Sequence, residues 1–139
     1  MLLTDTRRAS VFFCFDYISV LSNSPNLCHV DHFFPHILKG KTFDGYVDGV
    51  WNLVLACQSC NNGANGKFAK LPTNNLLARL NKRNEFFCSS HHPLNETVRN
   101  QLGVSPDDRE SKLKHYFKQA QDILIHTWEP QEIRGEEVF

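Results

Sequence analysis

The chain has no excess of charge of one sign and no long apolar run. Its 139 residues carry 15 lysines and arginines against 15 aspartates and glutamates, so the formal net charge is zero. Net charge therefore gives no support for a nucleic-acid partner, which must be argued from particular residues. No apolar stretch reaches the roughly 20 residues of a membrane helix, and the first residues lack the apolar core of a secretory signal. We expect a cytoplasmic protein with no membrane partner.

The cysteine count does not suit a disulfide framework. Five cysteines are an odd number, and in a cytoplasmic chain this favours metal ligation or simple burial. Hydrophobic residues make up 41% and charged residues 22% of the sequence, an ordinary globular composition. No repeat or low-complexity segment interrupts the chain, so its length predicts one structural unit.

Short strands and a brief helix are predicted in the first half. Residues 27–32 alternate as in a strand, and residues 51–56 are rich in β-forming side chains. A helix is expected to begin near residues 58–61 and to be short, because Gly63 and Gly66 weaken it. Residues 35–50 contain a proline and three glycines, which predicts a long irregular loop.

Helices predominate in the prediction for the second half. Asn74 or Asn75 is expected to cap the first helix, and Pro93 to open the second. Ser105 precedes a proline and two aspartates, a strong start signal for a third helix that Pro130 would end. Its apolar residues recur at helical spacing, which favours core packing over a cofactor site. They are Leu113, Tyr116, Phe117, Ala120, Ile123 and Leu124, and Thr127 continues the same spacing.

Basic residues are concentrated in one stretch despite the neutral total. Residues 61–100 carry six basic and two acidic side chains, a local charge of +4. Next to a catalytic site such a stretch can hold phosphates. The alternative is a solvated helix face, which charged residues form more often.

The most informative segments are HVDHFFPH (29–36) and WNLVLACQSCNNGANGKFAKLP (51–72). An Asp-His pair stands at the end of the first predicted strand, and asparagines mark the second strand and the helix after it. A Cys-x-x-Cys pair lies just before the second asparagine. The residues concerned are Asp31, His32, Asn52, Cys57, Cys60 and Asn61.

This combination resembles the HNH endonuclease family, whose ββα-metal (His-Me finger) motif places a histidine on one strand, an asparagine on the next and a ligand on a helix. The resemblance covers about residues 14–72. It implies an α+β fold: a ββα-metal finger with a partly degenerate zinc knuckle in residues 1–72. A mainly helical extension, residues 73–139, is expected to pack on that core as part of a single structural unit.

The residues themselves suit phosphodiester hydrolysis, which needs an activated water and neutralised charge. A neutral imidazole is a natural base for water near physiological pH, so His32 is the expected base. Asp31 is its neighbour on a strand and points to the opposite face unless the strand bends or ends there. The resemblance implies that Asp31 and Asn61 ligate one Mg²⁺, a hard ion suited to few oxygen ligands and several waters, or Mn²⁺ in its place. Asn62 is the neighbouring alternative to Asn61, which can instead be a helix cap.

Four further roles are expected around this centre. By resemblance, Asn52 steadies the catalytic histidine and fixes its tautomer. Lys67 and Lys70 are expected to contact phosphates, with a solvated face as the alternative reading. His36 is expected to line the cleft, although a surface-loop histidine is an equal alternative.

The cysteines predict a structural zinc site that departs from the family pattern. By resemblance, Cys57 and Cys60 form an intact knuckle, whereas the first knuckle would be Cys14 with Tyr17 in place of its second cysteine. A structural Zn²⁺ needs four ligands, and Cys28 is the first choice for the missing one. The other candidates are His29, Asp16 and water. The alternative is that these cysteines pack as small buried hydrophobes.

The resemblance implies a metal-dependent endonuclease that cuts double-stranded DNA, since most of the family does. No DNA-reading module is recognisable, so a partner protein or guide complex is expected to supply target choice. The first alternative is a non-cleaving zinc-knuckle module that binds nucleic acid or protein within a larger effector complex. The second is a helical interaction protein whose helix at residues 105–128 docks on a partner.

Overall fold

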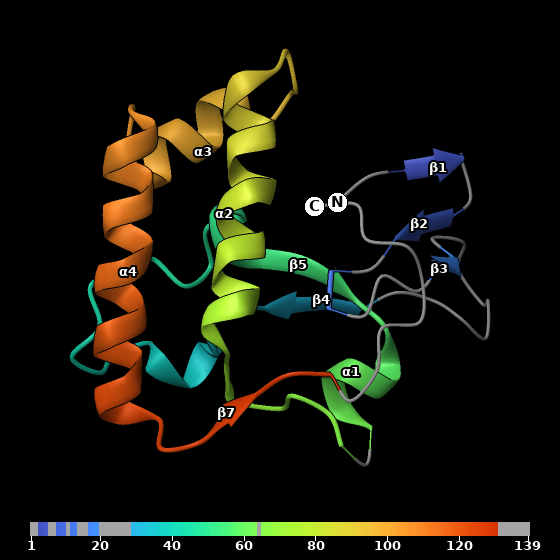
Figure 1. The fold of residues 1–139 in the computed structure, drawn as a ribbon, viewed down its shortest axis with the longest axis vertical. Coiled ribbons are helices and arrows are strands. Elements are labelled where there is room, and N and C mark those ends of the chain that lie inside the picture. Colours follow the sequence, from blue (N-terminus) through green and yellow to red (C-terminus); the bar gives the residue numbers. More distant parts are fainter. Residues whose placement is uncertain are drawn as a thin grey trace.

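An α+β arrangement of short strands and longer helices makes up the protein (Figure 1). The computed structural model describes residues 3–5, 8–10, 12–13, 17–19, 29–63 and 65–130. The helices are α1 (Gln58–Asn62), α2 (Asn74–Ser89), α3 (Asn95–Leu102) and α4 (Pro106–Ile123), with 3-10 turns η1 (His36–Leu38) and η2 (Val50–Asn52). The strands are β1 (Leu3–Asp5), β2 (Arg8–Ser10), β3 (Tyr17–Ser19), β4 (His29–His32), β5 (Leu53–Ala56), β6 (Leu71–Pro72) and β7 (Thr127–Trp128).

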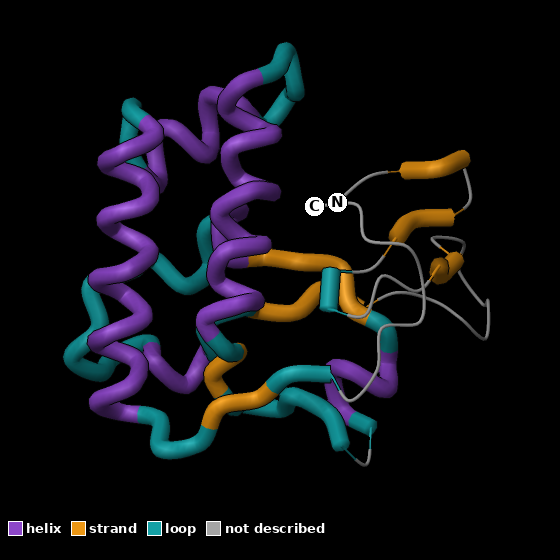
Figure 2. The backbone as a smooth tube through the Cα atoms, in the orientation of Figure 1, coloured by secondary structure: helices purple, strands orange, loops and turns teal. Residues whose placement is uncertain are grey.

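The strands form small separate sheets. β1, β2 and β3 pair antiparallel in that order, β4 pairs antiparallel with β5, and β6 pairs parallel with β7. Figure 2 shows α2 and α4 side by side, with α3 across one end of the pair. No helix in the described part of the chain is long and apolar enough to cross a membrane.

The pair β4–β5 confirms the two strands predicted around the Asp-His motif. His29 lies opposite Ala56 and His32 opposite Leu53, so the antiparallel register is fixed over the whole of β4. The connection between them is the predicted long loop, interrupted only by η1 and η2. α1 follows β5 directly, ends before Gly63 as predicted, and contacts β4.

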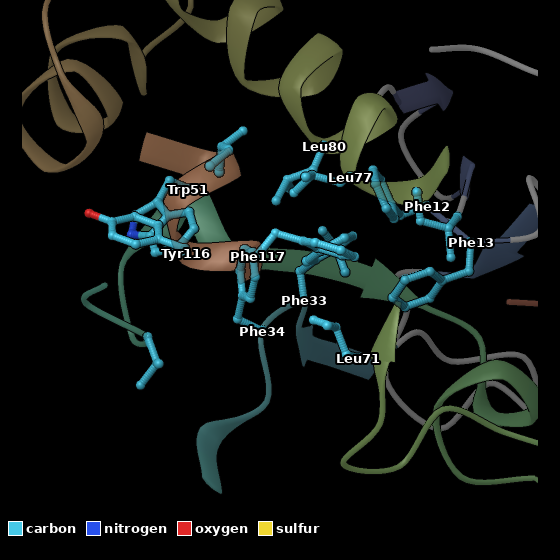
Figure 3. Close-up of a cluster of buried hydrophobic side chains, with 14 of the residues drawn as sticks. Phe12, Phe13, Phe33, Phe34, Trp51, Leu71, Leu77, Leu80, Tyr116 and Phe117 are labelled. Carbon is cyan, nitrogen blue, oxygen red and sulfur yellow. The ribbon is translucent and has the colours of Figure 1, made fainter. Parts of the chain in front are cut away.

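Aromatic packing fixes the end of β4 in the core (Figure 3). Phe33 and Phe34 follow His32 directly and are both fully buried. Phe34 packs against Trp51, with ring centroids 5.8 Å apart. Tyr116 of α4 packs on Trp51 in turn, at 5.3 Å. Each buried aromatic ring removes a large apolar area from water. The core therefore holds the backbone of His32, which directly precedes Phe33, in place.

Arg83 of α2 ties the helical half to the β4–β5 unit. Its guanidinium is fully buried and donates hydrogen bonds to the carbonyl oxygens of Leu53 at 2.6 Å and Trp51 at 2.9 Å. It also lies 5.0 Å from the ring centre of Phe87. Burial disfavours the charged form and lowers the pKa of Arg83 to about 9. The main-chain turn before β5 therefore takes its hydrogen bonds from a helix far away in the sequence.

The helix starts are close to prediction. The Ser105 hydroxyl accepts a hydrogen bond from the Asp108 amide at 3.1 Å and caps α4. Gly103 follows α3 with a φ of +134°, a conformation that glycine adopts without strain. Thr73 occupies the N-cap position of α2 without a side-chain capping hydrogen bond, and Asn74 and Asn75 are the first helical residues.

The predicted end of α4 at Pro130 is wrong. The helix stops at Ile123, and Thr127–Trp128 forms β7 beside β6. Trp128 is buried, packs edge-on against Phe13 at 5.0 Å, and donates its indole N–H to the Asn65 carbonyl at 2.8 Å. Continued helix would forfeit this burial, so tertiary packing ends α4 before the proline.

Candidate functional site

His32 and Asp48 form a partly exposed pair at the end of β4. His32 Nε2 lies 3.0 Å from Asp48 Oδ1, and their side chains are 29% and 34% exposed. Lys39 Nζ lies 3.0 Å from the other carboxylate oxygen, and His36 Nε2 lies 3.8 Å from Oδ1. Hydrogen bonds from His32 first and Lys39 second lower the pKa of Asp48. The imidazole thus faces an ionised carboxylate on an accessible surface.

Asp31 points to the other side of β4 and is buried. Its side chain lies 3.5 Å from the Lys67 ammonium, an ion pair too long for a well-formed hydrogen bond. Burial raises the pKa of Asp31, and the positive charge of Lys67 opposes that shift. Its Oδ2 atom has no hydrogen-bond partner among the described residues. This oxygen therefore has a cation beside it, the Lys67 ammonium, but no close hydrogen-bond donor.

Lys67 binds the backbone at the same point. Its ammonium is fully buried and donates to the His32 carbonyl at 2.8 Å and to the Phe68 carbonyl at 3.4 Å. Desolvation lowers the pKa of Lys67, and Asp31 opposes the shift. The predicted phosphate contact is therefore wrong for this residue, because a fully buried ammonium already bound to the protein interior is not offered to a ligand. Lys70, the other lysine in that prediction, is exposed.

Asn61 reaches β4 through His29. Its Nδ2 atom lies 3.2 Å from His29 Nδ1, and since the amide N–H donates, the ring nitrogen accepts. His29 and Asp31 are two residues apart on a strand and so share a face. The short helix α1 therefore brings Asn61 to the face of β4 that carries Asp31. The contact with His29 uses the amide nitrogen and leaves the amide oxygen out of it.

The Asn52 side chain is buried and bonded to the backbone on both sides of the long loop. Its buried amide accepts a hydrogen bond from the Phe34 N–H at 2.7 Å and donates to the carbonyls of Phe34 at 2.9 Å and Val47 at 2.8 Å. These bonds join the two ends of the long loop. The His32 ring itself faces Asp48, so any influence of Asn52 on His32 comes through the backbone, and the predicted fixing of the tautomer stays a prediction.

Asp31 and His32 lie on β4 and Asn61 lies on α1 against it, but the three side chains have different partners. Asp31 faces Lys67, His32 faces Asp48, and Asn61 faces His29. Lys67 is the link, since its ammonium lies near the Asp31 carboxylate and on the His32 carbonyl. Convergence of Asp31, His32 and Asn61 on one cation stays a prediction. His36, also predicted at the site, is 60% exposed with its ring centre 5.3 Å from that of His32.

The chemistry of the donors was compared with what a metal ion requires. Within the described ranges, no group of three or more His, Cys, Asp or Glu side chains is arranged to hold a metal ion. Asp31 and Asn61 offer a carboxylate and an amide oxygen, the hard donors that Mg²⁺ takes together with waters. The Asp31 Oδ2 atom makes no hydrogen bond to the described residues, but it lies 3.5 Å from the Lys67 ammonium. A bound cation would share Asp31 with the Lys67 ammonium.

The predicted zinc knuckle is only partly within the described residues. Cys57 and Cys60 are buried on either side of the start of α1. Cys14 and Cys28 lie outside the described residues. The structural Zn²⁺ therefore stays a prediction that rests on half of its proposed ligands.

Two residues of the candidate site, Asp48 and His29, are not predicted from the sequence in the positions they occupy. Asp48 stands in a glycine-rich loop 16 residues after His32, with no spacing rule that links the two. His29 was considered only as a zinc ligand, although its place two residues before Asp31 put it on the same strand face. That alternation was the one signal that pointed to it.

Comparison with protein-family models, curated proteins and solved structures finds no match to this chain.

Proposed function

We propose that this chain is a metal-dependent endonuclease that hydrolyses phosphodiester bonds, with double-stranded DNA as its substrate. In this proposal β4, β5 and α1 are the two strands and the helix of a ββα-metal finger. His32 is the general base, and Asp31 and Asn61 hold one Mg²⁺ or Mn²⁺. The supporting observation is the Asp31 oxygen that is buried without a hydrogen bond, on the strand face that Asn61 reaches and one residue before His32.

The residues divide the work at the end of β4. When bound, the cation supplies positive charge that stabilises negative charge developing on the phosphate. Asp31 and Asn61 hold that charge at the end of the strand. His32, on the accessible side, takes a proton from water as the water attacks phosphorus. Lys67 links His32 to Asp31, because its ammonium is bound to the His32 backbone and paired with the Asp31 carboxylate.

A plasmid-cleavage assay tests the proposal. The chain is expected to convert supercoiled plasmid to open or linear forms in Mg²⁺, and EDTA is expected to abolish the conversion. His32→Ala should lose cleavage by about 100-fold or more, the usual contribution of a general base. His115→Ala is the matched control, because His115 of α4 also pairs with an aspartate, Asp44 at 2.9 Å. Equal loss in both variants, or cleavage by His32→Ala at the parent rate, would contradict the proposal.

The second candidate is a non-cleaving module that binds nucleic acid or a partner protein. The observation that favours it is the Lys67 ammonium 3.5 Å from Asp31, a cation already present where the metal ion is proposed. Mn²⁺ binding followed by electron paramagnetic resonance separates the two candidates. Tight Mn²⁺ binding that Asp31→Asn abolishes supports the nuclease, whereas DNA binding with neither Mn²⁺ uptake nor cleavage supports the non-cleaving module.

A further inference from the structure

Both oxygens of the Asp48 carboxylate are used by cationic or hydrogen-bonding side chains. Oδ1 lies 3.0 Å from His32 Nε2, and Oδ2 lies 3.0 Å from Lys39 Nζ. His36 Nε2, at 3.8 Å from Oδ1, is beyond hydrogen-bond distance. His32 is thus the hydrogen-bond partner of Oδ1, and Lys39 is the hydrogen-bond partner of Oδ2.

An ionised carboxylate accepts hydrogen bonds and donates none. Of the two neutral forms of an imidazole, only the one protonated at Nε2 can donate to Asp48 Oδ1. In that form Nδ1 carries the lone pair and is the nitrogen that can take a proton. The contact between His32 and Asp48 therefore selects a chemical state of the ring, and it does so from a residue outside the predicted catalytic set.

We infer that Asp48 is a positioning residue that holds the His32 ring in the form protonated at Nε2, so that Nδ1 is the atom that accepts the proton of the attacking water. The role of Nδ1 in the reaction rests on the proposed endonuclease function. The protonation of the ring at Nε2 does not depend on that function. The lowered pKa of Asp48 agrees with a carboxylate that stays ionised at neutral pH.

The proton transfer balances without a further reactant. One O–H bond of water breaks, and its proton forms a new bond to His32 Nδ1. The water oxygen forms a bond to phosphorus while the bond from phosphorus to the leaving oxygen breaks. The leaving oxygen takes a proton from solvent, and the Nδ1 proton returns to solvent afterwards. Asp48 remains ionised throughout and faces the transient imidazolium at 3.0 Å.

The His36 ring packs edge-on against the His32 ring at 5.3 Å between centroids, and Asp48 supplies the hydrogen bond to the imidazole. Lys67 and the partner strand fix the backbone of His32, through the 2.8 Å bond to its carbonyl and its register with Leu53. Neither contact touches the imidazole. Among the hydrogen bonds of the described residues, the bond to Asp48 is the one that sets how the ring is turned.

Nitrogen-15 NMR of the histidine rings in the full chain tests the state of the ring directly. In slightly alkaline buffer the parent should show His32 protonated at Nε2 and not at Nδ1, with slow exchange of the Nε2 proton. Asp48→Ala should speed this exchange and remove the signal. Asp44→Ala is the matched control, because Asp44 makes the same contact with His115 Nε2 at 2.9 Å. It should change the His115 signal and leave that of His32 intact.

Cleavage kinetics test the catalytic consequence. Asp48→Ala should lower kcat by about 10-fold to 100-fold, the usual effect of removing a residue that orients a catalytic group, with KM unchanged. Asp44→Ala should change neither constant. Asp48→Leu keeps the volume of the side chain but has no acceptor, and it repeats the test if the alanine variant unfolds at a lower temperature than the parent.

Each outcome of these two experiments tests a separate part of the inference. A His32 ring protonated at Nδ1 in the parent, or a signal indifferent to Asp48→Ala, overturns the inference whether or not the chain cleaves DNA. The predicted ring signals in a parent that never cleaves would overturn the endonuclease and the proton-accepting role, while the positioning of the ring would stand. A kcat unaffected by Asp48→Ala in an active parent would overturn the catalytic consequence.

Discussion

The Lys67 ammonium lies 2.8 Å from the His32 carbonyl oxygen, although 35 positions separate the two residues in the sequence. The same ammonium is 3.5 Å from Asp31 Oδ2 and is fully buried. A buried ammonium is costly unless carboxylate and carbonyl oxygens compensate it. The Asp-His pair at the end of β4 supplies both, so the pair supports the fold as well as the proposed chemistry.

Replacement of Lys67 by methionine should therefore lower the free energy of unfolding. The variant leaves the Asp31 carboxylate buried without its counter-charge, a loss of about 3 kcal/mol for a buried pair. Urea denaturation measures it. Lys70→Met, at an exposed site three residues along, should change stability by less than about 0.5 kcal/mol. The double variant Lys67→Met/Asp31→Asn should recover part of the loss, and a purely additive result would show that the two side chains are not coupled.

Local signals in the sequence were enough to predict much of the architecture. The strands β4 and β5, the short α1 and the start of α4 each follow from residues within a few positions: alternation, glycines after the helix, and a capping serine before a proline. The end of α4 was predicted wrongly because it depends on Trp128, which is buried against Phe13 from the other end of the chain. The helix propensity of the residues near position 124 does not depend on that tertiary contact, so it cannot predict where the helix ends.

The candidate site was less predictable for the same reason. The positions of Asp31, His32 and Asn61 were identified by their spacing, and the structure places all three on or against β4. The partners of these residues depend on how the loops fold back. In the sequence Lys67 cannot be distinguished from the other basic residues nearby, but in the structure it is fully buried. Asp48 is an unremarkable acid between glycine-rich turns, yet it lies 3.0 Å from the His32 ring.

Replacement of Phe68 by glycine should stabilise the protein. Phe68 has a φ of +49°, a left-handed conformation that is strained for a bulky residue, and its side chain is 55% exposed. Relief of that strain is worth about 1 kcal/mol after the extra freedom of glycine in the unfolded chain is subtracted. Thermal and urea unfolding of Phe68→Gly and Phe68→Ala provide the measurement.

The alanine variant at the same position is the control for this prediction. Alanine removes the ring but keeps a Cβ atom in the left-handed region, so it should be less stable than glycine by about 1 kcal/mol. If the alanine variant proves the more stable of the two, the strain at Phe68 is not present in solution. The order of stability therefore tests the backbone conformation independently of any loss of ring contacts.

The contribution of Asp48 to stability should disappear in acid. Its hydrogen bonds with His32 and Lys39 lower its pKa below the usual 3.8, so the folded state favours the ionised form. This stability is fully present above pH 3.8 and is lost as the pH falls through the lowered pKa. The difference in unfolding free energy between parent and Asp48→Asn should shrink over that range in urea titrations.

A second aspartate offers a comparison for the acid dependence. The pKa of Asp44 is lowered by hydrogen bonds from His115 and Gln119, so Asp44→Asn should show the same direction of change. The double variant should show the sum of the two effects, because the aspartates have separate partners. A difference for Asp48→Asn that grows as the pH falls below 3.8 would contradict the assignment of its hydrogen bonds.

Arg83→Met should destabilise the protein more than any surface substitution. The guanidinium supplies hydrogen bonds to the carbonyls of Leu53 and Trp51, which lose their donors in the variant and stay buried. We expect a loss of about 3 kcal/mol in unfolding free energy. Arg83→Lys should recover little, because one ammonium cannot reproduce the planar fork of donors. Lys82→Met, at the exposed neighbouring position of α2, is the control and should be nearly neutral. Full recovery by lysine would show that charge alone, and not the directed hydrogen bonds, holds α2 to the strand that carries the candidate site.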